Sequence, residues 1–306
     1  MPIASRRIHL VCGKGGVGRS SVAAALAEAA AGLGKRVLLS EIADAEGGPS
    51  TLGRRFGRES LGPDPVGLGP EGLEGCQLSA TRGQELFVRS VIPAGPMVRA
   101  ALRSKGLRRF IDAVPSLFEL GVFYHLLMLL EARGADGRPL HEVLVVDMPA
   151  TGQTLGLTSL PEVLLSVLPS GPIPDTMRQG QAYLNDPKLC LAWVVTLPEL
   201  LPVTEALELV EGLEATDVAT AGLLLNRVPE DPFEPEEEEV LEELFAEQSL
   251  HGELAFRRLG AAREARALLR ASTELPVYEL AECPGDSPDA LRAALRARLA
   301  ALMESP

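Results

Sequence analysis

Cysteine is scarce in this sequence of 306 residues, and its spacing excludes two kinds of structure. The four cysteines, Cys12, Cys76, Cys190 and Cys283, lie far apart and form no C-x-x-C pair. Structural zinc sites and disulfide frameworks depend on closer or regular spacings. We therefore expect four buried free thiols, since unpaired cysteines are among the most buried residues.

Positive charge is also in short supply. The chain has 29 lysines and arginines against 42 aspartates and glutamates, which gives a formal net charge of -13. Nucleic acids and anionic lipid surfaces bind proteins that cluster lysine and arginine. The composition therefore argues against a nucleic-acid partner.

No apolar run in the sequence has the length of a membrane-spanning helix. The longest, LGVFYHLLMLLEAR at residues 120–133, is too short to cross a bilayer. The first segment, MPIASRRIHLVCGKGG, runs straight into a glycine-rich loop and leaves no room for a secretory signal peptide. We expect a cytoplasmic protein with no stable membrane insertion.

Apolar segments of strand length alternate with longer segments of helical period. This alternation is typical of β-α units that build a parallel sheet with helices on both faces. We predict an α/β fold with a mostly parallel central sheet, flanked by helices, in a single domain over residues 1–306. The predicted strands span residues 7–12, 36–42, 75–80, 142–148, 190–197, 220–228 and 276–280.

Three segments depart from the regular alternation. Residues 43–72 are dense in glycine and proline and predict a long mobile loop. Residues 84–133 contain no convincing strand and predict an inserted α-helical subdomain of several amphipathic helices. Residues 230–248 predict a charged helix entered through Pro235, whose glutamates form a solvated face.

The segment GKGGVGRSS is a predicted phosphate-binding loop between a strand and a helix. Residues 13–20 fit the pattern G-x-x-x-x-G-K-[ST], except that Arg19 replaces the lysine. Glycines let the main-chain amides face one anion, and the helix adds its positive N-terminal end. The hydroxyl of Ser20 is placed to bind the Mg²⁺ that bridges the phosphates of ATP. The predicted nucleotide-binding residues here are Gly13, Lys14, Gly15, Gly16, Val17, Gly18, Arg19, Ser20 and Ser21.

Lys14 is a second cation in this loop. With it, GKGGVGRSS resembles the deviant Walker A sequence K-G-G-V-G-K-[ST] of dimeric P-loop ATPases of the SIMIBI class, which include the chromosome-partition, septum-site, nitrogenase-iron-protein and arsenical-pump families. In that class the extra lysine reaches across a dimer interface and stabilises charge in the transition state at the partner's nucleotide. The resemblance implies this catalytic role for Lys14. Arg19, in the position of the usual loop lysine, is the other catalytic residue expected in the loop.

A second stretch, VVDMPATGQTLGLTSLP at residues 145–161, narrows the resemblance to one family. It is similar to the D-T-A-P-T-G-H-T-L-R-x-L motif of the arsenical pump-driving ATPase and of its relative that delivers tail-anchored membrane proteins. The resemblance implies that Asp147 acts in catalysis and, with Ser20, holds the magnesium ion and its bound water. It also implies that Thr151 and Gly152 begin a loop that senses the γ-phosphate.

Residues 194–228 carry further matches. VVTLPELLPVTEALELVEGL and AGLLLNRVP look like the family's V-T-L-P-E-x-x-P-V-x-E segment and its N-R-V strand end. The matching Asn226 is thereby implied to bind the adenine, whereas a lone asparagine after a strand is more often a turn former. The resemblance spans most of the chain in the expected order and implies ATP and Mg²⁺ as cofactors.

The sequence also departs from the family at several positions. When LGRRFG is matched to the family's L-x-D-x-F, Arg54 stands where an acid positions the attacking water. Glu41 and Asp44 are nearby carboxylates with a different spacing, and Gln153 replaces the usual histidine. The zinc-binding C-x-x-C motif of the targeting family is missing, and no cysteine trio suggests arsenite binding. The sequence therefore contains no motif that supports either cargo, arsenite or a tail-anchored membrane protein.

The apolar residues of the predicted insertion have two interpretations. The equivalent region of the targeting family carries a hydrophobic groove for client proteins, but such residues at helical spacing more often form core. His125 is expected to be a core or edge histidine with satisfied hydrogen bonds. The apolar residues are Leu86, Phe87, Val91, Met97, Phe110, Leu117, Phe118, Phe123, Leu126, Leu127 and Met128.

Two functional hypotheses follow from the sequence. In the first, the chain is a dimeric Mg-ATPase that uses ATP binding and hydrolysis to open and close on an unidentified protein client. In the second, it is a nucleotide-binding regulator with little turnover, or the degenerate half of a heterodimer with a paralogous ATPase. Arg19 and Arg54 favour the second, and the near-complete motif set favours the first. A membrane-surface positioning ATPase is a weaker third alternative, because the helix at residues 286–306 lacks bulky anchors.

Overall fold

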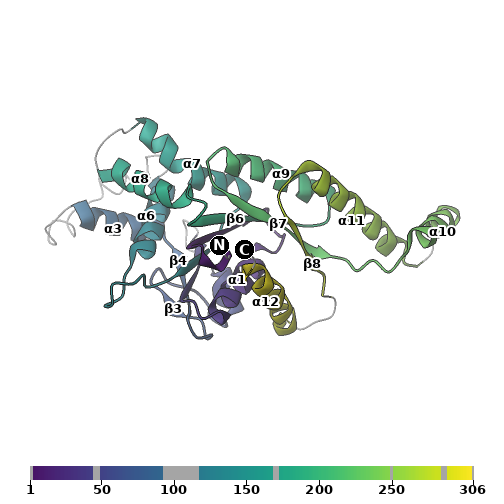
Figure 1. Cartoon of the computed structure of the whole chain (residues 1–306), viewed down its shortest axis with the longest axis horizontal. Coiled ribbons are helices and arrows are strands. Elements are labelled where there is room, and N and C mark those ends of the chain that lie inside the picture. Colours follow the sequence, from purple (N-terminus) through teal and green to yellow (C-terminus); the bar gives the residue numbers. More distant parts are fainter. Residues whose placement is uncertain are drawn as a thin grey trace.

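A computed structural model describes residues 3–43, 49–91, 117–167, 172–248, 251–283 and 288–304. Its centre is an eight-stranded sheet with the order β3-β4-β2-β5-β1-β6-β7-β8. All neighbouring pairs are parallel except β3 and β4. The predicted α/β fold, with a mostly parallel sheet flanked by helices, is confirmed (Figure 1).

Every predicted strand is present, with each end within two residues of its expected position. The apolar runs identified these strands because their residues are buried on both faces of the sheet, as in β1, β5 and β6. The strands are β1 (Ile8–Gly13), β2 (Val37–Ile42), β3 (Val66–Gly67), β4 (Leu73–Leu78), β5 (Val143–Asp147), β6 (Cys190–Thr196), β7 (Thr220–Val228) and β8 (Val277–Ala281).

Helices cover both faces of this sheet (Figure 1). A short 3-10 helix, η1 (Ile3–Ser5), precedes β1. The helices are α1 (Arg19–Gly32), α2 (Thr51–Arg55), α3 (Ala80–Val91), α6 (Leu117–Glu131), α7 (Thr151–Val167), α8 (Pro172–Leu184), α9 (Leu200–Glu214), α10 (Pro235–Glu247), α11 (Glu253–Ser272) and α12 (Pro288–Glu304).

One face of the sheet packs against α1 and α12. Helix α1 is rich in alanine, which favours helix and allows close packing against β1, β2 and β5. Leu299 and Met303 of α12 are fully buried in the same apolar cluster as Leu26 of α1. At its edge, Arg292 of α12 forms a 2.7 Å ion pair with the buried Glu28 of α1. These contacts tie two segments that lie far apart in the sequence.

The other face packs against α6, α7, α8, α9 and α11, which form a second apolar cluster with the sheet. In this cluster α3 lies against α6 at two glycines, because a Cβ at Gly83 would sit 1.7 Å from the carbonyl oxygen of Gly121. His125 of α6 is buried, and its Nδ1 accepts a 3.0 Å hydrogen bond from the Ser79 amide. The prediction of a satisfied core histidine is confirmed.

The two irregular predicted segments differ from expectation. Residues 43–72 were predicted to be one loop, but they contain α2 and the short strand β3, with residues 44–48 outside the described part. The helical insertion starts at Ala80 rather than at residue 84. Most of α6 is buried against the sheet, which confirms core for Phe123, Leu126 and Leu127. Residues 92–116, with Met97 and Phe110, lie outside the described residues, so the client groove stays a prediction.

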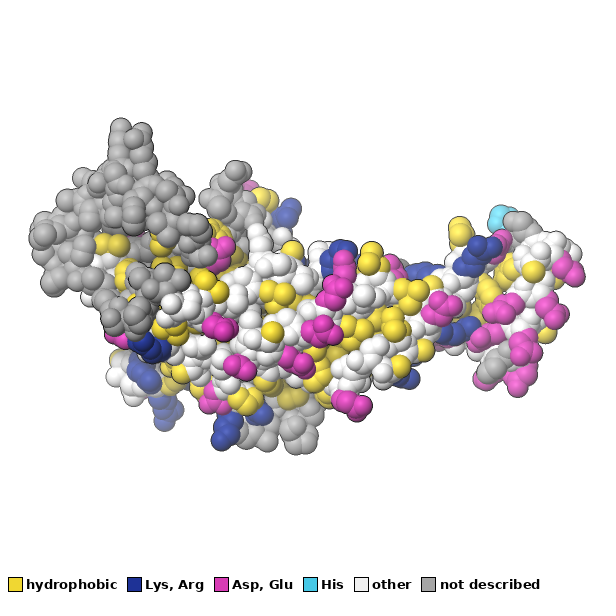
Figure 2. Space-filling view, turned by 90° about the horizontal axis from the view of Figure 1, so that it is seen from above, with side chains coloured by type: hydrophobic (Ala, Val, Ile, Leu, Met, Phe, Trp, Pro, Cys, Tyr) yellow, Lys and Arg dark blue, Asp and Glu magenta, His cyan; other side chains and the backbone are white. Residues whose placement is uncertain are grey.

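Helices α10 and α11 form a hairpin that projects from the body of the protein (Figure 1). The charged helix predicted near residues 230–248 is confirmed as α10, with Pro235 in its first turn and Glu234 and Glu237 in a capping box. The ring of Phe256 contacts the rings of Phe233 and Phe245, with centroids 6.0 Å and 5.3 Å apart. Glutamates gather over α10 at one end of the molecule (Figure 2), as predicted for a solvated face.

Among the helices that the structure describes, none combines the length and the apolar character that crossing a bilayer requires.

Candidate functional site

The predicted phosphate loop lies at the carboxyl end of β1, between β5 and β6. Gly13, Gly16 and Gly18 have positive φ angles of 145°, 88° and 97°. Two of them also face close neighbours. A Cβ at Gly13 would lie 2.4 Å from the carbonyl oxygen of Val195, and one at Gly18 would lie 2.4 Å from Nδ2 of Asn226. Glycine is therefore required here both by conformation and by space.

The front of the loop is open. A Cβ at Gly15 or Gly16 would meet no atom within 4 Å among the described residues. Helix α1 begins at Arg19 directly behind these glycines, so its unpaired amides and the positive end of its dipole face the same space. The loop therefore fits an anion of phosphate type by its shape and by its donors.

Asn226 braces this loop from the end of β7. Its buried side chain donates a 2.8 Å hydrogen bond from Nδ2 to the carbonyl oxygen of Val17. Sequence reasoning predicted that Asn226 binds adenine, and this stays a prediction. The structure adds a contact that the sequence did not reveal, because Val17 and Asn226 are far apart along the chain.

Lys14 does not point into its own loop. Its Nζ forms a hydrogen bond and an ion pair with Oε1 of Glu205 on α9. The Lys14 side chain is 46% exposed and that of Glu205 is 27% exposed. The contact therefore lies at the surface, beside the mouth of the loop, where the ammonium group remains accessible to another molecule.

Arg19 also turns away from the open side of the loop. Its Nη1 donates hydrogen bonds to the carbonyl oxygens of Met148 and Pro149, the two residues that follow β5. Both hydrogen bonds come from one nitrogen at the end of the side chain, and a lysine side chain ends one bond earlier, so the two residues would place their charge differently. In this arrangement Arg19 ties the start of α1 to the end of β5.

Asp147 lies at the end of β5 beside this contact. It is 8% exposed, and burial raises the pKa of its carboxyl to about 6, which a hydrogen bond from Ser20 and the charge of Arg19 partly oppose. Among the described residues its Oδ1 has no hydrogen-bond partner. A buried carboxylate oxygen without a partner beside a hydroxyl is the donor set that Mg²⁺ prefers. Ser20 and Asp147 thus fit a magnesium ion that also has phosphate ligands.

The predicted γ-phosphate-sensing loop has a different form. Thr151 and Gly152 are the first residues of α7, so the chain turns into a helix where the sequence predicted a loop. Oγ1 of Thr154 donates a 2.9 Å hydrogen bond to the carbonyl oxygen of Pro149, next to Arg19. Gln153 is exposed. The helix tolerates Pro161 in its interior.

Helix α2 contacts α1, the helix that follows the loop, and was not predicted. The Glu41 carboxylate, at the end of β2, accepts hydrogen bonds of 3.1 and 3.0 Å from the amides of Thr51 and Leu52. Ser50 caps the same helix. Sequence reasoning noted Glu41 only as a carboxylate at the wrong spacing. In the structure it holds the helix that carries Arg54 and Arg55, and Asp44 lies outside the described residues.

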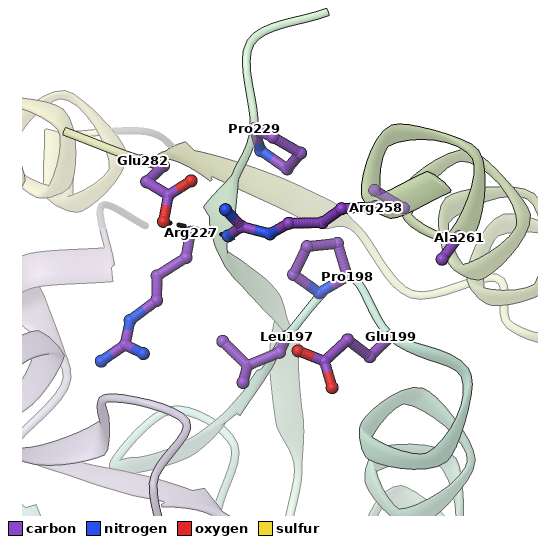
Figure 3. A pocket seen from close by; sticks show the side chains of 9 residues that line it. Leu197, Pro198, Glu199, Arg227, Pro229, Arg258, Ala261 and Glu282 are labelled. Carbon is purple, nitrogen blue, oxygen red and sulfur yellow. Dashed lines mark hydrogen bonds and ion pairs between the residues drawn. The ribbon is translucent and has the colours of Figure 1, made fainter. Parts of the chain in front are cut away.

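A cavity of about 210 Å³ opens beside the loop, at the carboxyl ends of β6, β7 and β8 (Figure 3). Arg258 of α11 lies across it between Pro198 and Pro229 and forms a 2.9 Å ion pair with Glu282. Arg227, in a left-handed conformation with φ 55°, follows Asn226 and points away from Arg258. The cavity therefore adjoins the residue predicted to bind adenine.

The cysteines take no part in this site. Cys12, Cys76 and Cys190 are buried free thiols, and burial raises the pKa of Cys12 and Cys76 to about 12. Cys283 is only partly buried, which corrects the expectation for that residue. Over the described part of the chain, no group of three or more histidine, cysteine or acidic side chains is arranged to hold a metal.

Comparison with known proteins identifies the family of this chain. Residues 6–170 match the model of a family described as anion-transporting ATPases. ATPase BagA of Mycobacterium tuberculosis (strain H37Rv) is 25% identical over 244 residues, which is 76% of this chain and 68% of the relative. A related sequence of Mycobacterium bovis gives the same identity and coverage. Because the family match covers more than half of the chain and includes the phosphate loop and Asp147, this chain belongs to the anion-transporting ATPase family.

Proposed function

We propose that this protein is a dimeric Mg-ATP-dependent ATPase that opens and closes on a protein partner. One observation carries the proposal. The glycine loop has an open front lined by main-chain amides, and beside it the buried Asp147 keeps one carboxylate oxygen without a partner among the described residues. Family membership makes the protein an ATPase, and the identity of the partner remains part of the proposal.

Each loop residue then has a distinct task. The amides of Gly15, Gly16 and Gly18 bind phosphate oxygens, and the amide of Ser20 adds the end of α1. Ser20 and Asp147 would hold the magnesium ion, whose charge polarises the phosphates when it is bound. Asn226 keeps the loop in place through Val17. For adenine, the cavity next to Asn226 supports recognition at that end of the sheet.

Lys14 is proposed to act on the nucleotide of a second subunit. Its exposed ammonium group and its position beside the loop support this role. In the structure Glu205 holds it, so the dimer must compete with one exposed ion pair, a contact of about 0–1 kcal/mol. Such a weak contact releases the lysine easily while it keeps the side chain ordered in the single chain.

Coupling to a partner is proposed to run through α7. Its first turn, from Thr151 to Leu155, joins the end of β5, and its length packs against α6 and α8. Helix α6 in turn contacts α3, the visible start of the insertion. A movement of the loop can therefore be transmitted through packed helices to the region where a client would bind.

The alternative function is a nucleotide-binding regulator or one half of a heterodimeric pair. Two observations favour it specifically. Arg19 binds the carbonyl oxygens after β5 instead of the open side of the loop, and Arg54 lies on α2 where the family has an acid. Both arginines would slow hydrolysis, and both would leave the main-chain amides of the loop in place to bind phosphate.

Calorimetric titration with Mg-ATP tests the shared basis of both functions, because each requires binding at micromolar to millimolar concentration. Phosphate release by the purified chain then separates them. Steady turnover supports the ATPase, whereas binding with turnover only after a paralogous ATPase is added supports the regulator. Light scattering with a non-hydrolysable ATP analogue tests the dimer. No heat of binding for Mg-ATP would overturn both proposals.

A further inference from the structure

We propose that Arg55 binds the phosphate groups of the nucleotide from within the same chain. This inference rests on the proposed function, since it assigns a further residue to the same site. Arg55 stands one position after Arg54 and has no counterpart among the motif residues identified from the sequence. Its assignment depends on where α2 lies and on the charges around the start of α1.

Helix α2 is held in place from three sides. Glu41 binds its first two amides, and Gln77 of β4 donates a 3.1 Å hydrogen bond to the same carboxylate. Leu52 is fully buried in the apolar cluster of α1. A helix of only five residues is thus fixed by its contacts rather than by its own stability.

The carboxyl end of α2 is fixed by α12. Nη1 of Arg292 lies 3.4 Å from the carbonyl oxygen of Arg55, and its guanidinium lies 5.0 Å from the centre of the Phe56 ring. Arg292 is itself paired with the buried Glu28. The backbone of Arg55 is therefore anchored, and only its side chain is free to adjust.

The Arg55 side chain reaches the first turn of α1. Its Nη2 donates a 2.6 Å hydrogen bond to Oγ of Ser21, the residue after the proposed magnesium ligand Ser20. Partial desolvation lowers the pKa of Arg55, and the attraction of Asp147 opposes this effect. The guanidinium thus faces the side of the loop where the metal and the phosphates would lie. Within the described residues Ser21 is its one hydrogen-bond partner, so most of its five donors are free.

The charges at the start of α1 favour the binding of an anion. The positive end of a helix dipole stabilises negative charge and repels cations. The first turn of α1 nevertheless contains no acidic residue, begins with Arg19 and receives Arg55 from α2. The carboxylate of Asp147 attracts both guanidinium groups, and a bound phosphate would add the anion that the first turn of α1 itself lacks. Arg19 binds the carbonyl oxygens after β5 and Lys14 binds Glu205, whereas Arg55 binds the hydroxyl of Ser21 in the first turn of α1, directly beside the proposed phosphate site.

Titration of Mg-ATP into the Arg55→Gln variant tests this assignment. Glutamine removes the charge and is too short to keep the hydrogen bond to Ser21, so a purely structural role would appear as a lower melting temperature. For a role at the phosphates, we expect the affinity for Mg-ATP to fall roughly ten- to a hundredfold, the range for a lost charge-assisted hydrogen bond. Arg55→Lys, which keeps the charge, should fall between the two. Arg58→Ala is the matched control, because Arg58 lies just after α2 and binds the carbonyl oxygen of Gly67 instead.

The possible outcomes are distinct. An Arg55→Gln variant that binds Mg-ATP as tightly as the Arg58→Ala control overturns the inference and leaves the proposed function standing. A natural chain that binds no Mg-ATP at all overturns both. Thermal melting is measured for each variant, and an affinity loss at an unchanged melting temperature supports the inference. If Arg55→Gln melts early, Arg55→Lys decides. A folded lysine variant that binds Mg-ATP clearly more tightly than Arg55→Gln supports charge at the phosphates, and one with the affinity of Arg55→Gln opposes it.

Discussion

The phosphate-loop edge of the sheet and the α10–α11 hairpin differ in how their polar residues are used. At the loop edge, Asp147 and Asn226 are buried, and Asn226 donates a hydrogen bond to the carbonyl oxygen of Val17, which is far away in the sequence. On the hairpin, most glutamates of α10 face solvent, and Phe245 of α10 and Phe233 before it contact Phe256 of α11, beside an ion pair between Glu238 and Arg263. Buried polar groups need partners, whereas exposed ones do not.

This difference separates function from stability. Burying a polar residue at the loop edge costs free energy, which an apolar residue at the same position would not cost. The polar residues there therefore point to binding or catalysis rather than to stability. A glutamate on α10 costs little and contributes little beyond solubility. We therefore expect substitutions at the loop edge to change binding or rate, and substitutions on the hairpin to change only stability, by small amounts.

The largest expected effect is that of Lys14→Ala on turnover. If Lys14 acts across a dimer, its loss should lower kcat about 10³-fold or more, as for a cation that stabilises transferring phosphate. Affinity for Mg-ATP should stay within a few-fold, because the amides of the loop remain. Lys188→Ala, at an exposed lysine far from the loop, is the control. Equal losses of affinity and turnover in Lys14→Ala would show that Lys14 binds its own nucleotide instead.

The next effect concerns pH and the centre of the sheet. His9 of β1 is fully buried, accepts a hydrogen bond from Nε1 of Trp193, and has a pKa lowered to about 4 by burial. The unfolded chain takes up this proton near pH 6.5, so stability is complete above that pH and is lost as the pH falls towards 4. The loss amounts to about 3 kcal/mol for His9, at 1.36 kcal/mol per pKa unit.

Urea unfolding at pH 7 and pH 5 measures this dependence. His9→Gln should flatten it, while His251→Gln, at an exposed histidine on the hairpin, should leave it unchanged. His125 has a pKa lowered to about 4 as well, so part of the dependence remains in His9→Gln. An unchanged slope in His9→Gln would contradict the assignment.

A smaller effect is expected for Arg19→Lys. The lysine side chain ends one bond short of Nη1, so we expect its ammonium group to leave the carbonyl oxygens of Met148 and Pro149 and to turn towards the phosphates. Turnover should rise about tenfold, equivalent to 1.4 kcal/mol of the barrier. Phosphate release at saturating Mg-ATP measures it, with Arg19→Gln as the uncharged control. A rate equal to that of the natural chain would mean that Arg19 does not restrain hydrolysis.

The smallest effect is predicted for the hairpin. A Cβ at Gly260, within α11, meets no atom within 4 Å among the described residues, so Gly260→Ala should stabilise the protein by about 0.5–1 kcal/mol. Gly83→Ala is the matched comparison, because its Cβ would overlap the Gly121 carbonyl between α3 and α6. Thermal melting should rise for the first and fall for the second. A fall for both would show that the hairpin is packed more tightly than this structure indicates.

The sequence predicted the elements that depend on local pattern. The buried strands were visible as apolar runs, and the loop was visible because Gly13 to Ser20 must follow a strand and precede a helix. Helix α2 was missed because five residues in a glycine-rich segment have no helical period, and its stability comes from Glu41 and Leu52. The partners of Arg19, Lys14 and Arg55 could not be predicted, since each lies on an element distant in the sequence.

The packing of α12 against α1 has a consequence for the order of assembly during synthesis. The phosphate loop and α1 leave the ribosome early, but the helix that covers the outer side of α1 and anchors Arg55 through Arg292 is encoded at residues 288–304. Contacts between such distant segments form late in folding. A nascent chain therefore carries the glycine loop before α12 covers α1 and anchors the backbone of Arg55.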